Sequence, residues 1–92
     1  MIRYSLGEKI TNLFIEIIEL ILIAGYSERS QKLLILQKVS VRLDLLKFFL
    51  QTAFELNAID NTKLAALAIP IGDVGKQLGG WQRQLSKQTP PQ

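Results

Sequence analysis

The sequence has 92 residues and contains neither cysteine nor histidine. Without cysteine the chain has no disulfide, no thiolate nucleophile and no cysteine-ligated metal. Without histidine it lacks the side chain that titrates near neutral pH and that most often ligates metals. An enzyme built from this chain would have to rely on Lys, Glu, Asp or Tyr alone. We therefore expect a non-enzymatic protein without metal or cofactor, which acts by binding, scaffolding or assembly.

Long apolar runs are also missing. The most apolar stretch, residues 13–24, is too short to cross a bilayer, and Glu16 and Glu19 interrupt it. It begins too late for a secretory signal and has no cleavage site after it. We expect a cytoplasmic protein without a membrane partner.

Acidic residues are absent from the end of the chain. The whole sequence has 11 basic and 8 acidic residues, a net charge of +3. Residues 1–73 are neutral overall, so the excess comes from Lys76, Arg83 and Lys87. A locally basic end favours a polyanion such as nucleic acid as the partner. The alternative is an ordinary solubilising helix end, where cations suit the helix dipole.

Three stretches with helical periodicity predict an all-α protein. In each stretch apolar residues recur at alternating spacings of three and four residues, and two short breaks separate the stretches. The predicted helices span residues 5–24, 28–56 and 61–87. Their end signals are a capping box, a C-terminal glycine and two N-cap side chains. These signals are Ser5 with Glu8, Gly25, Ser27, and Asp60 or Asn61.

Short connections make successive helices antiparallel neighbours. The predicted fold is therefore an antiparallel up-down bundle of three long helices, forming one domain over residues 1–88, with a disordered tail at 89–92. The apolar stripes, above all on the first helix, are wider than such a bundle needs. We expect a fourth helix or another subunit to cover the surplus.

The third predicted helix carries an unbroken heptad seam that includes Trp81. The seam favours Trp81 as a core anchor, with a base-stacking platform as the alternative. Pro70 removes one backbone donor and clashes with the preceding turn, which predicts a kink or a local break over residues 67–70.

Three glycines, Gly72, Gly75 and Gly79, fall on one side of the same helix. Each costs ~1 kcal/mol against alanine in a helix interior. Their clustering predicts that a neighbouring backbone approaches closely. The neighbour is either another helix of the same chain, in a tight crossing, or another subunit.

Two sets of basic residues are candidate phosphate contacts. Lys76, Arg83 and Lys87 share one face of the third helix, at spacings of seven and four residues. Lys38 and Arg42 lie four residues apart on the second helix.

Three segments resemble a known family. They are Arg-Tyr-Ser-Leu-Gly-Glu-Lys at 3–9, Ala-Gly-Tyr-Ser at 24–27, and Asp-Val-Gly-Lys-Gln-Leu-Gly-Gly-Trp at 73–81. Together they look like the Avd family, the accessory variability determinant proteins of diversity-generating retroelements, within the bacterial four-helix-bundle proteins. The similarity runs from Arg3 to about Lys87. Lys76 matches a basic position of the terminal motif. The other candidate cations are assigned only from the helix face on which they lie.

The resemblance implies a non-enzymatic partner of a reverse transcriptase. Members of the family form a barrel-like homopentamer with basic surfaces and bind nucleic acid, either template RNA or cDNA. They usually carry one more helix before the segment at 3–9, where this sequence has only Met1 and Ile2. They also run an uninterrupted last helix where this sequence has Pro70. The alternative function is a helical assembly module without nucleic-acid binding, related to the four-helix proteins encoded in intervening sequences of ribosomal RNA genes.

Overall fold

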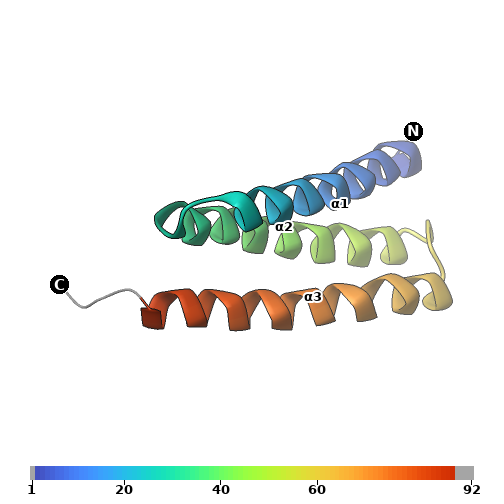
Figure 1. Cartoon of the computed structure of the whole chain (residues 1–92). Helices are drawn as coiled ribbons and strands as arrows, with labels where there is room; N and C mark the ends of the chain where they lie inside the picture. Colours follow the sequence, from blue (N-terminus) through green and yellow to red (C-terminus); the bar gives the residue numbers. More distant parts are fainter. Residues whose placement is uncertain (1, 89–92) are drawn as a thin grey trace.

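The computed structural model describes residues 2–88, and side chains from Leu6 to Lys87. This part of the chain forms three helices and no strand: α1 (Ile2–Tyr26), α2 (Arg29–Glu55) and α3 (Asn61–Gln88) (Figure 1). The predicted all-α fold class is therefore confirmed. The tail predicted to be disordered, residues 89–92, lies outside the described residues.

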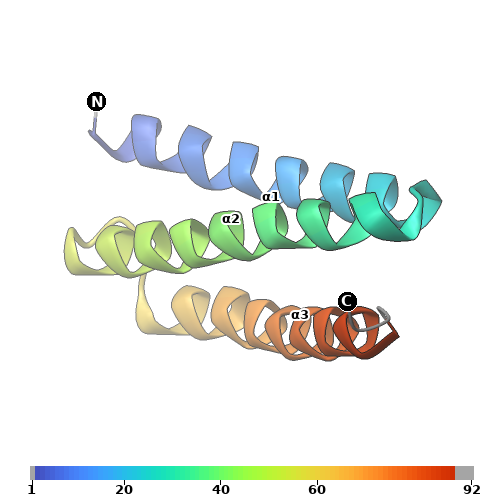
Figure 2. The ribbon, with the colours of Figure 1, turned by 90° about the vertical axis from the view of Figure 1, so that its left-hand side faces the viewer.

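Helix α2 lies in the middle of the molecule. Figures 1 and 2 show α1 along one side of it and α3 along another, with successive helices running in opposite directions. Within the described residues, no Cα atom of α1 lies within 8 Å of a Cα atom of α3. The bundle is elongated, with extents of 50 × 20 × 19 Å. Both outer helices therefore depend on α2 for their close backbone packing.

The core follows the periodicity of the sequence. The six positions with the three–four rhythm on α2 are all buried, and they include the largest fully buried side chains of the described chain. Helices α1 and α3 each contribute a buried row that faces them. The α2 positions are Leu36, Val39, Leu43, Leu46, Leu50 and Ala53; the facing rows are Leu13, Ile17 and Ala24 on α1, and Ile71, Leu78 and Leu85 on α3.

The ends of α1 differ from the prediction. The helix already begins at Ile2, so Ser5 lies inside it and the predicted capping box is wrong. Gly25 is helical with a negative φ and is not the terminating residue, because α1 runs on to Tyr26. The apolar periodicity of α1 continues through Gly25, and a glycine without a positive φ does not stop a helix.

Of the N-caps predicted for the other two helices, one is wrong and one is confirmed. Ser27 was expected to cap α2, but its hydroxyl donates to the carbonyl of Ile23 at 2.6 Å, and so it closes the end of α1. The N-cap of α2 is Glu28, which makes no side-chain capping bond. Asp60 does cap α3, since its Oδ1 accepts the backbone N–H of Lys63 at 2.8 Å.

Pro70 does not interrupt α3. The helix is continuous from Asn61 to Gln88, so the predicted local break is wrong. Pro70 and Ala66, whose carbonyl would have accepted the missing N–H, are both exposed. Water can therefore satisfy that carbonyl, and packing of the partly buried Leu67 before Pro70 and the buried Ile71 after it holds the helix in place.

Candidate nucleic-acid interface

The basic stripe predicted on the third helix forms one exposed face of α3. Lys76, Arg83 and Lys87 are all exposed, and Lys87 lies in the last turn of the helix. The nearest acidic residue on α3 is Asp73, after which the sequence contains none. The stripe thus has a positive field along about three helical turns, with little opposing charge.

Lys47 of α2 extends to α3 near the first residue of this stripe. Its Nζ lies 3.8 Å from where a Cβ on Gly75 would stand, next in sequence to Lys76. No local signal could have assigned Lys47 to α3, because the pairing of the two helices is decided by tertiary packing. The basic surface of α3 consists of Lys76, Arg83 and Lys87, and Lys47 of α2 lies near its first residue.

The glycines of α3 do not mark a tight crossing within the chain. Apart from the backbone of its own helix, a Cβ on Gly72 would meet no atom of the described residues within 4 Å. A Cβ on Gly75 would meet only side chains of α2, the nearest being Cδ2 of Leu43 at 3.4 Å. At Gly79 the only neighbour is the guanidinium of Arg83, at 3.6 Å. The expected crossing is therefore wrong, whereas the alternative, a subunit interface at these glycines, stays a prediction.

Arg83 lies against the glycines one turn before it. Its two terminal nitrogens stand 3.6 and 4.0 Å from the Cβ positions of Gly79 and Gly80. Because neither glycine has a side chain, the guanidinium lies close to the helix backbone. A phosphate bound there would reach a planar donor at the helix surface, the geometry in which arginine binds phosphate best.

Lys38 and Arg42 lie apart from this surface. The Nε of Arg42 donates to Glu16 of α1 at 3.1 Å, in an ion pair whose side chains are 34% and 50% exposed. A terminal nitrogen of Arg42 also donates to the backbone carbonyl of Lys38 at 3.3 Å. Both residues therefore belong to the α1–α2 side of the molecule, and Glu16 offsets the charge of Arg42.

The sequence model of the bAvd-like family matches residues 1–85. The chain belongs to the bAvd-like family. No curated protein and no solved structure matches it. The match confirms the resemblance to Avd proteins, and it supports a role as an accessory protein of diversity-generating retroelements.

In this bAvd-like protein Trp81 is half-buried and packs against the core, together with Val74 and Leu67 of the same helix. This is the position of a core anchor. Packing against the core therefore covers most of the indole surface, and little of it remains available for stacking on a base.

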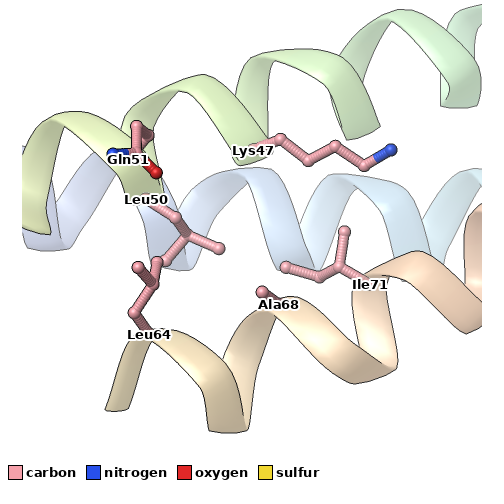
Figure 3. A pocket seen from close by; sticks show the side chains of 6 residues that line it. All are labelled: Lys47, Leu50, Gln51, Leu64, Ala68 and Ile71. Atoms are coloured by element: carbon pink, nitrogen blue, oxygen red, sulfur yellow. The ribbon is translucent and has the colours of Figure 1, made fainter. Parts of the chain in front are cut away.

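A shallow pocket lies between α2 and α3 beside the basic surface. Figure 3 shows its apolar lining, with Lys47 extending along α2 on one side and Gln51 on the other. The apolar residues that line it are Leu50, Leu64, Ala68 and Ile71. In this bAvd-like chain the pocket combines the ammonium group of Lys47 and the amide of Gln51 with an apolar floor.

The described residues contain neither a cluster of metal ligands nor a membrane-spanning helix. No group of three or more acidic side chains gathers there that could hold a metal ion. None of the helices in that part of the chain is both long and apolar enough to span a membrane.

Proposed function

We propose that this bAvd-like protein is a non-enzymatic accessory subunit of a diversity-generating retroelement. It binds template RNA or cDNA through the basic surface of α3, and it binds the reverse transcriptase as a cytoplasmic homo-oligomer. The observation that carries the proposal is the exposed stripe of Lys76, Arg83 and Lys87 along one face of α3, with no acidic residue after Asp73.

The binding we propose is electrostatic. Each phosphate that a lysine or arginine neutralises releases condensed counterions, which contributes ~−0.7 to the slope of log K against log salt on a single strand. Three such contacts give a slope of about −2. Affinity should therefore fall steeply between low and high salt, with little dependence on base sequence.

Assembly strengthens this weak contact. Several copies of the basic surface on one oligomer bind the same strand with an effective concentration in the millimolar range, so that the assembly binds far more tightly than one chain. A rigid helical platform can thereby hold template RNA beside the polymerase without any catalytic group of its own.

The test is fluorescence anisotropy with a labelled single-stranded RNA over a series of salt concentrations. The variant combines Lys76→Gln, Arg83→Gln and Lys87→Gln, and we expect it to lose most of the affinity and most of the salt dependence. The control is Lys63→Gln on the same helix, 13 residues or about 20 Å from Lys76. It should bind nearly as the wild type does. Wild-type binding that ignores salt, or a variant that binds unchanged, would contradict the proposal.

A pull-down with the reverse transcriptase of the same retroelement tests the second partner. The competing function, a helical assembly module, predicts a stable oligomer that binds neither RNA nor polymerase. A reverse-transcriptase gene and a variable repeat beside the coding sequence would favour the accessory function.

A further inference from the structure

The two outer helices bury matched rows of apolar side chains against α2. Among the described residues, α1 and α3 each contribute three buried side chains to the core, and four partly buried apolar side chains pack beside each row. The free energy gained by burial is roughly proportional to the apolar area removed from water, so it stabilises the two helices to a similar extent. Any large difference in stability between α1 and α3 has to come from another source.

The backbones of the two outer helices differ. Helix α1 contains Gly7 and, in its last turn, Gly25, whereas α2 contains neither glycine nor proline. An interior glycine lowers the equilibrium constant for helix formation about fivefold relative to alanine, and an interior proline lowers it by roughly 100-fold. The intrinsic preference of α3 for the helical state is therefore far below that of α1 or α2, because α3 contains five such residues: Pro70, Gly72, Gly75, Gly79 and Gly80.

Close packing within the chain does not offset the glycines of α3. Apart from the backbone of its own helix, a Cβ on Gly72 would meet no atom of the described residues within 4 Å, and one on Gly79 would meet only Arg83. At Gly75 the neighbours are side-chain atoms of α2 rather than backbone atoms. The missing side chains thus bring no other backbone closer, and the low helix propensity of α3 remains uncompensated.

Polar contacts between helices also favour the pairing of α1 with α2. The Nε of Arg42 lies 3.1 Å from a carboxylate oxygen of Glu16, and the Nζ of Lys9 lies 5.9 Å from the ring centroid of Phe49. Both contacts join α1 to α2, whereas no ion pair in the described part of the chain involves α3. Since no described Cα atom of α1 lies within 8 Å of one in α3, α3 can leave α2 without separating α1 from it.

We infer that α3 opens from the bundle as one unit while α1 and α2 stay paired, and that bound nucleic acid holds α3 closed. The connection at residues 56–60, which joins α3 to α2 at one end of the bundle, is the hinge (Figure 1). Once it has left α2, α3 melts, because a helix without a packing surface is marginal in water. Lys76, Arg83 and Lys87 then no longer share a face. The binding site of the proposed function, on which this inference rests, therefore exists only while α3 is docked.

Hydrogen exchange, measured residue by residue by NMR, tests the order of opening. The full chain is used without nucleic acid, at a protein concentration where monomers prevail. Amides at the centre of α3 should exchange at least ~10-fold faster than those at the centres of α1 and α2, because opening of one unit precedes global unfolding. Equal exchange in the three helices, or faster exchange in α1 than in α3, would overturn the inference.

Two variants that change helix propensity separate local opening from global unfolding. Gly72→Ala should slow exchange throughout α3 about four- to fivefold, since every opening of α3 melts residue 72. Glu19→Gly is the matched change at an exposed position of α1. It should speed exchange in α1 and α2 about two- to threefold and leave α3 unchanged, because α1 stays folded when α3 opens. If Glu19→Gly speeds exchange in α3 as much as in α1, the bundle opens as a whole and the inference fails.

Adding oligouridylate at low salt tests the closing of α3. A ligand that binds only the docked helix lowers the open population by one plus the ratio of free ligand to Kd, or about 100-fold when that ratio is about 100. Exchange in α3 should slow accordingly, and the variant that combines Lys76→Gln, Arg83→Gln and Lys87→Gln should lose the effect. RNA that binds without slowing exchange in α3 would overturn the inference and leave the proposed function standing. Absence of RNA binding would contradict the proposed function and the closing by nucleic acid, whereas the order of opening is measured without RNA and is decided separately.

Discussion

Replacing Gly72 by alanine tests how α3 is packed. Gly72 is inside the helix, its φ is not positive, and a Cβ added to it meets nothing within 4 Å. Alanine therefore fits without strain. It removes the entropic penalty of a glycine, since the unfolded chain has fewer conformations to lose.

The expected gain is about 0.8–1 kcal/mol in the free energy of unfolding, the difference between glycine and alanine in a helix interior. For a domain of this size a gain of ~1 kcal/mol raises Tm by roughly 4–8 °C. Gly75→Ala is the matched comparison. Its Cβ would touch Cδ2 of Leu43 at 3.4 Å, so a small adjustment of Leu43 should make the gain smaller.

The assay is urea unfolding followed by circular dichroism, at a protein concentration where monomers prevail and again at a high concentration. Stabilisation of the monomer by Gly72→Ala would support the claim that the face of α3 at Gly72 is open. If the monomer is destabilised, the reasoning is refuted, because the chain itself would then crowd Gly72. Destabilisation confined to the high concentration would place Gly72 in a subunit interface instead.

Three further changes probe the fold. Pro70→Ala should raise stability by up to ~3 kcal/mol in thermal unfolding, because it restores a helical hydrogen bond in the exposed middle of α3; a loss would show that Pro70 has a packing role. Leu46→Ala should cost about 2–5 kcal/mol in urea unfolding since Leu46 is fully buried, whereas the neighbouring Leu45→Ala should cost under ~1 kcal/mol in the monomer. Equal costs for the two would refute the assigned face of α2. Asp60→Ala should cost ~1 kcal/mol by removing the cap bond to Lys63, measured by the same unfolding assay, and an unchanged midpoint would show that water replaces the cap.

The sequence alone predicted the three helices and the buried positions of α2. All six positions with the three–four rhythm are buried, because helical periodicity is a local property that the order of apolar residues determines. Asp60 was predictable for the same reason, since a cap acts on the three residues that follow it. The family could also be identified from the sequence, because its motifs are short and contiguous.

Helix ends with several competing signals were less predictable. Ser5 with Glu8 has the form of a capping box, but the helix begins earlier, at Ile2. Ser27 can cap the helix after it or close the helix before it, and the structure shows the second arrangement. Such choices depend on small differences in free energy between neighbouring hydrogen-bond partners, which the sequence does not rank.

The sequence by itself determined that this protein is helical, that its last 19 residues are basic without an acid, and that its apolar surface exceeds the needs of three helices. Only the tertiary structure decided which helix each charged residue of α2 contacts. Lys47 extends to α3 at Gly75, whereas Arg42, five residues earlier and on another side of the same helix, pairs with Glu16 of α1. The physical reason is that periodicity specifies the faces of one helix, but the identity of the helix that each face meets follows from how the whole chain packs.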